Sequence, residues 1–123
     1  MDKLPYSEKN EAKKFLQNKI AKMKYNRARS YYYNEDYYEA INLFKEYIDD
    51  KYMTSDIKLD CRLGLIDSLL KYGQENYENE SYWNAKENFE EVLNIFNNYS
   101  QVRNKYVNPP IKFTKNKLGE ALV

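Results

Sequence analysis

The sequence predicts an all-α fold of two stacked antiparallel helical hairpins, four main helices in all, with a C-terminal extension. Three observations indicate this fold. The 123 residues include only three glycines and three prolines, and so few helix breakers favour long helices over strands and turns. Apolar residues recur at spacings of three and four, which is the period of an amphipathic helix. The chain also matches itself at an offset of 45 residues, so that a second hairpin is expected to follow the first.

The first hairpin is predicted from two periodic stretches on either side of a polar break at residues 34–36. We expect its first helix at about 7–33, because Ser7 and the glutamates that follow it suit a helix N-terminus. Its second helix is expected at about 36–50, with Asp36 as the N-cap. The first helix should present an apolar face and a neighbouring seam, and the second helix one apolar face. The face of the first helix consists of Phe15, Leu16, Ile20 and Met23, its seam of Ala21, Tyr25, Ala28 and Tyr32, and the second face of Tyr37, Ala40, Ile41, Phe44, Tyr47 and Ile48.

The second hairpin follows the same plan. Thr54 or Ser55 can cap a helix at about 55–74, the polar stretch 75–80 is the expected turn, and Ser81 can cap a helix at about 81–97. Each helix has a clear apolar face. The faces are Leu59, Leu63, Ile66, Leu70, Gly73 and Tyr77 on the third helix, and Tyr82, Ala85, Phe89, Val92 and Phe96 on the fourth. The stretch 100–107 is compatible with a further short helix.

A pair of prolines, Pro109 and Pro110, ends the predicted helical domain at residue 107. We expect residues 108–123 to be basic and mostly extended. The cations and the aromatic ring of this segment make it a candidate docking arm, formed by Lys112, Phe113, Lys115 and Lys117.

The self-match places small residues on small ones and bulky residues on bulky ones. Ala28 matches Gly73, and Ala40 and Phe44 match Ala85 and Phe89. The segments Ala28-x2-Tyr31, Tyr37-x2-Ala40-Ile41-x2-Phe44 and Tyr82-x2-Ala85-x3-Phe89 resemble the tetratricopeptide-repeat pattern of a small residue, an aromatic residue and A-x3-F. The period is longer than the family's 34 residues by 11, about three helical turns. The tryptophan and leucine of the family's first helix fall on Lys24 and Arg27, and its closing proline is missing.

The resemblance implies a superhelix of stacked hairpins whose concave groove, lined by the first helix of each hairpin, binds partner peptides. Carried onto the first helix, it gives five groove residues: Lys22, Tyr25, Arg29, Tyr32 and Tyr33. Aromatic side chains and arginine dominate binding hot spots. The alternative is that Tyr25 and Tyr32 belong to the core seam and that Arg29 is a solvated charge.

Catalysis is not expected, because the residues that usually perform it are missing. The chain has no histidine and one cysteine, Cys61, which excludes an internal disulfide, a cysteine-cluster metal site and the usual catalytic triads. It has no phosphate-binding glycine loop. We therefore predict no catalytic residues, no cofactor, no metal and no small-molecule substrate. With no signal peptide and no membrane span in the sequence, an intracellular location is favoured.

Charge is distributed unevenly along the chain. Residues 1–30 hold nine Lys and Arg against three Asp and Glu, and residues 101–123 hold five against one, whereas residues 34–100 hold six against fifteen. We predict a non-enzymatic protein–protein interaction module, an adaptor or a subunit of a larger complex. A partner, a second copy or the C-terminal segment should cover the open end of the fourth helix. The alternative is an RNA- or ribosome-associated factor that uses the basic ends.

Overall fold

The computed structural model describes residues 6–105, which form five helices and no strand. These are α1 (Tyr6–Tyr33), α2 (Tyr37–Ile48), α3 (Ser55–Glu78), α4 (Tyr82–Asn98) and α5 (Ser100–Lys105). The predicted all-α class is thus confirmed for this part of the chain. The predicted bounds agree with the observed ones to within four residues. The predicted basic segment 108–123 and its candidate docking arm lie outside the described residues.

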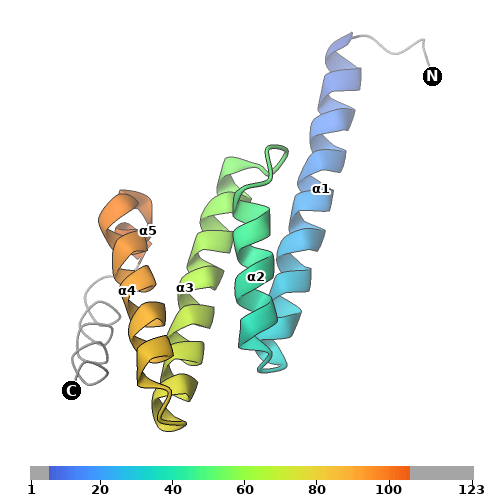
Figure 1. Cartoon of the computed structure of the whole chain (residues 1–123). Helices are drawn as coiled ribbons and strands as arrows, with labels where there is room; N and C mark the ends of the chain where they lie inside the picture. Colours follow the sequence, from blue (N-terminus) through green and yellow to red (C-terminus); the bar gives the residue numbers. More distant parts are fainter. Residues whose placement is uncertain (1–5, 106–123) are drawn as a thin grey trace.

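The four long helices stand side by side in chain order, and successive helices run in opposite directions (Figure 1). Each packs against the next, and α1 also contacts α3. The short helix α5 packs against α3 and α4, with the side chain of Val102 fully buried. The N-terminal half of α1 extends past the ends of α2 and α3 (Figure 1).

The turns α1–α2 and α3–α4 have the same backbone geometry, 45 residues apart. Glu35 and Glu80 each adopt a left-handed conformation with φ of 63°. The amides of Asp36 and Ser81 each donate a hydrogen bond to the carbonyl five residues earlier, over 2.9 and 2.7 Å. Together with a bond from each glutamate amide to the carbonyl three residues earlier, this is the Schellman arrangement that ends many helices. Asp36 is the N-cap of α2, as predicted, and its side chain accepts a hydrogen bond from the amide of Glu39.

Two phenylalanines on the second helices pack against glycines on α3. The ring of Phe44, from α2, lies on Gly64, and the ring of Phe89, from α4, lies on Gly73. Both rings are fully buried, as are Ala28, Ala40 and Ala85. Small residues on both sides let the helix backbones approach closely, and the phenylalanines fill the seams that remain.

The C-terminal end of α3 differs from the prediction. The polar stretch 75–80 was expected to hold the turn, but α3 continues to Glu78. Tertiary contacts with α4 explain the extra turn of helix. The Asn76 side-chain amide donates to that of Asn88 over 2.8 Å, and the rings of Tyr77 and Tyr82 meet edge to face with centroids 5.4 Å apart.

The predicted apolar face of α1 is present but uncovered. Phe15, Leu16, Ile20 and Met23 are 52–69% exposed. The seam beside them is what packs, since Ala21 and Ala28 are buried. The reason lies in the arrangement of the helices, because among the described residues none lies over that side of α1.

Candidate functional site

A groove between α1 and α3 contains most of the predicted binding residues. Tyr25, Arg29, Tyr32 and Tyr33, all from α1, line a pocket of about 130 Å³. Its far side is formed by Phe44 of α2 and by Gly64 and Asp67 of α3. The direct packing of α1 against α3 brings these side chains together. Four of the five predicted groove residues therefore share one concave site.

A second pocket continues the groove toward the C-terminal end of α3. It has a volume of about 230 Å³ and shares Tyr32 and Asp67 with the first pocket. Leu70, Lys71 and Gln74 of α3 complete it. The two pockets together form one channel between the helices, which we call the α1–α3 groove. Its chemistry is mixed, with tyrosine rings along one wall and an acid, a base and an amide along the other.

Arg29 is held between aromatic rings in this groove. Its guanidinium carbon lies 5.4 Å from the ring centroid of Tyr25 and 5.0 Å from that of Tyr33, which are cation–π distances. Arg29 also donates a hydrogen bond to the hydroxyl of Tyr33, and this bond raises the pKa of the guanidinium. The cation is thus positioned in advance for a ligand, so that little side-chain entropy remains to be lost on binding.

Tyr25 and Tyr32 contribute to both the groove and the core. Both are half-buried and pack against the hydrophobic core, and burial raises the pKa of each phenol. The ring of Tyr25 lies 6.1 Å from that of Phe44, centroid to centroid. Both therefore have the core role that the alternative interpretation gave them, and each also lines the groove.

Lys22 is the predicted groove residue that does not line it. It is exposed, about one turn from Tyr25 toward the N-terminus. The sequence interpretation also missed the α3 wall, although the 45-residue offset contains the signal. Applied to Lys22, Tyr25 and Arg29, that offset gives Asp67, Leu70 and Gln74, all of which line the groove.

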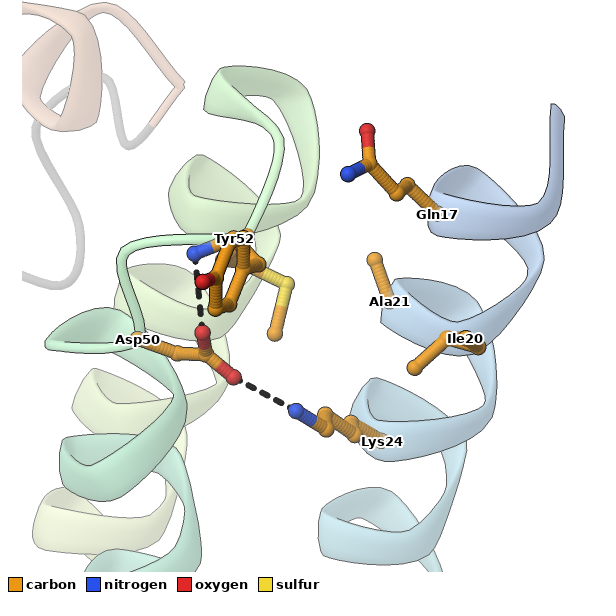
Figure 2. Close-up of a pocket in the computed structure, with 7 residues that line it drawn as sticks. Gln17, Ile20, Ala21, Lys24, Asp50 and Tyr52 are labelled. Atoms are coloured by element: carbon orange, nitrogen blue, oxygen red, sulfur yellow. Dashed lines mark hydrogen bonds and ion pairs between the residues drawn. The ribbon is translucent and has the colours of Figure 1, made fainter. Parts of the chain in front are cut away.

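A second site lies between α1 and the loop that joins α2 to α3. Gln17, Ile20, Ala21 and Lys24 face Asp50, Tyr52 and Met53 across a pocket of about 190 Å³ (Figure 2). The Lys24 ammonium donates to the Asp50 carboxylate over 2.5 Å, and the Tyr52 amide donates to the other carboxylate oxygen over 2.9 Å. Hydrogen bonding to Lys24 lowers the pKa of Asp50, and the same bond raises the pKa of Lys24. The pair ties the middle of α1 to this loop.

The described residues hold no group of three or more acidic, cysteine or histidine side chains placed to bind a metal ion. Cys61 is buried, and burial raises the pKa of its thiol to about 12. A thiol in this state is a poor nucleophile at neutral pH. None of the helices within residues 6–105 is long and apolar enough to cross a membrane.

Comparisons of the chain with models of known protein families, with curated proteins and with solved structures found no match. Functional interpretation therefore depends on the geometry and the chemistry of the chain itself.

Proposed function

We propose that this chain is a non-enzymatic protein-interaction module of the tetratricopeptide-repeat kind, which binds an extended partner segment in the α1–α3 groove. The observation that carries the proposal is the gathering of Tyr25, Arg29, Tyr32 and Tyr33 around one pocket opposite Asp67. Two matching turns 45 residues apart support the view that the hairpins are repeats of one unit. An adaptor or a subunit of a larger complex would use such a groove.

The size of the groove favours a peptide over a small molecule. Sites for drug-sized ligands usually measure about 300–1,000 Å³, whereas the two groove pockets measure about 130 and 230 Å³. Each has room for one or two side chains. An extended segment that places successive side chains in the two pockets fits this geometry. Arg29 favours a carboxylate or an aromatic ring in the first pocket, and Lys71 favours an acid in the second.

Selection of peptides from a random library on the purified chain, followed by titration of each selected peptide, tests the proposal. Peptides should bind the unaltered chain, and Arg29→Ala should weaken their binding by about tenfold or more, the loss typical of a hot-spot residue. Tyr33→Ala should act in the same direction, because it removes one face of the cation site. Tyr33 is 65% exposed, so its replacement should leave the fold intact.

Lys22→Ala is the matched control, because Lys22 lies on α1 and carries a charge but does not line the groove. Its variant should bind the selected peptides as the unaltered chain does. Selected peptides whose affinity is unchanged by Arg29→Ala and Tyr33→Ala would place binding elsewhere and contradict the proposal.

The charge of α1 supports a second candidate function, an RNA- or ribosome-associated factor. The helix holds eight lysines and arginines against two glutamates. Phosphate contacts make the affinity for RNA fall steeply with salt. Filter binding of single-stranded RNA between low and physiological salt tests this function. Salt-dependent retention that paired charge reversals of Lys13 and Lys14 abolish supports it, and no retention at low salt eliminates it.

A further inference from the structure

The side of α1 that faces away from the groove carries a row of exposed residues, which we call the outer stripe. It consists of Ala12, Leu16, Lys19 and Met23, spaced by four, three and four residues, with Phe15 and Ile20 beside them. This spacing places them along one side of the helix. Leu16, Ile20 and Met23 are 58%, 52% and 69% exposed. An apolar row of this length is a typical mark of a protein contact.

The second hairpin shows what such a stripe does in this fold. Shifted by 45 residues, the outer stripe falls on α3, which packs closely with α2. Its first and last three positions there are Ile57, Cys61 and Ser68, all buried, and Leu65, the counterpart of Ile20, is also buried. Its remaining position is Gly64, which touches the ring of Phe44 on α2. On α3, therefore, this side of the helix lies under the second helix of the preceding hairpin.

The charge around the outer stripe indicates what kind of helix would fit. Lys9, Lys13, Lys19 and Lys22 lie within it or along its edges, and none forms an ion pair with another described residue. The ammonium of Lys19 lies 5.5 Å from the ring centroid of Phe15, so the cation lies over the apolar row. The N-terminal part of the stripe is thus both apolar and basic.

A hollow beside the stripe would receive side chains from a helix laid along it. It has a volume of about 710 Å³ and lies between α1 and α2, with Ile20, Met23 and Arg27 on the α1 side. Its α2 side includes Glu46 and Asp49. The hollow is therefore mixed in charge at the C-terminal end of the stripe, whereas the end from Lys9 to Lys19 is basic.

We propose that the outer stripe docks an acidic amphipathic helix of a partner protein, laid along α1 as α2 lies along α3. Its apolar residues would cover Leu16, Ile20 and Met23, and its carboxylates would meet Lys13 and Lys19. A helix identical to α2 does not fit, because Lys19 stands where Gly64 admits the ring of Phe44. The partner helix therefore carries a short or acidic residue at that point. This second surface does not depend on the α1–α3 groove.

Photo-crosslinking in the cells that contain the protein tests the docking, with p-benzoylphenylalanine replacing Met23 in the full chain. The expected product is a crosslink to a segment of another protein with acids and apolar residues at helical spacing, identified by mass spectrometry. Leu16→Glu should reduce its yield by about tenfold or more, because docking would bury an unpaired carboxylate. Leu16 is exposed, so the change should leave the fold intact.

Asn18→Glu is the matched control. It adds the same charge to the same helix at an exposed position outside the outer stripe, and it should leave the crosslink in place. The groove variant Arg29→Ala should also leave it in place. Failure of the groove proposal and failure of this one are therefore distinguishable.

Four other outcomes would overturn the proposal. A crosslink to nucleic acid, or to a segment without acids, would show a different ligand. A yield that Leu16→Glu does not change would remove the stripe from the contact. Binding of the purified chain to phosphatidylcholine–phosphatidylserine vesicles, lost in Leu16→Glu but retained in Asn18→Glu, would assign the stripe to a membrane surface. A dimer seen by sedimentation and lost in the same variant would assign it to a second copy.

Discussion

Replacement of Gly64 by alanine tests the close packing of α2 on α3, on which the stacking of the two hairpins depends. A Cβ atom at this position would lie 2.6 and 2.9 Å from two ring carbons of Phe44 and closer still to a third. The ring cannot easily move away, because Phe44 is fully buried. Gly64 lies inside a helix, so alanine would otherwise be the better residue there.

Two opposing effects set the magnitude. Alanine stabilises a helix interior by about 1 kcal/mol relative to glycine, whereas overpacking a well-filled core costs about 1–3 kcal/mol. The clash involves three ring atoms, so we expect the second effect to win. The free energy of unfolding should fall by about 1 kcal/mol, which lowers the melting temperature by about 4 °C for a domain of this size.

Urea unfolding followed by far-ultraviolet circular dichroism measures this change, and a double-mutant cycle with Phe44→Leu identifies its cause. Leucine lacks the distal ring atoms that the new methyl group meets. In that background Gly64→Ala should be neutral or stabilising by up to about 1 kcal/mol, which gives a coupling energy of about 1–2 kcal/mol. If Gly64→Ala stabilises the unaltered chain, or has the same effect in both backgrounds, the close packing of these helices is wrong.

Three further predictions concern the turns, the ion pair and the cysteine. Glu35→Gly and Glu80→Gly should each stabilise the fold by about 0.5–1 kcal/mol, because glycine adopts a φ of 63° without strain; a lower melting temperature in either variant contradicts this. Asp50→Asn should cost about 0.5–1 kcal/mol at pH 7, a modest value because the Lys24 side chain is 37% exposed. The pKa of Asp50 lies below its ordinary 3.8, so the contribution of the pair is present above that value and is lost as the pH falls through the lowered pKa. The pKa of Lys24 lies above 10.5, so the contribution is also lost as the pH rises through the raised pKa. A cost of Asp50→Asn that is the same at pH 2 and pH 7 would refute this role. Cys61, with a pKa of about 12, should react with a thiol reagent at pH 8 only when the chain unfolds, and rapid reaction of the native protein would show that the thiol is accessible.

The sequence was sufficient to predict the helices because the signals for them are local. Apolar spacing predicts each long helix, and Asp36 marks the start of α2 by its own hydrogen-bonding chemistry. The end of α3 was not predictable in this way. Its last turn depends on the contact of Asn76 with Asn88 on another helix, and no property of the polar stretch itself indicates that contact.

Burial was predictable only where both partners of a contact were recognised. The row from Leu16 to Met23 has the spacing of a buried face, but burial needs a neighbouring helix, and the described residues supply none there. The α1 wall of the groove followed from a family resemblance. The α3 wall, including Asp67 and Gln74, required the same offset to be applied to the binding residues as well as to the core.

The position of α1 at one end of the row explains why it offers two surfaces. A helix inside the row, such as α3, has helices packed on both sides, so that its counterpart of the outer stripe is covered. On α1, Leu16 and Met23 lie roughly opposite Tyr25 and Arg29, since each residue turns the helix by about 100°. A ligand on one side therefore need not displace a ligand on the other. If both proposals hold, Leu16→Glu and Arg29→Ala should each remove one ligand and leave the other bound. Their double variant should lose both with additive effects, whereas strong non-additivity would mean that one ligand covers both sides of α1.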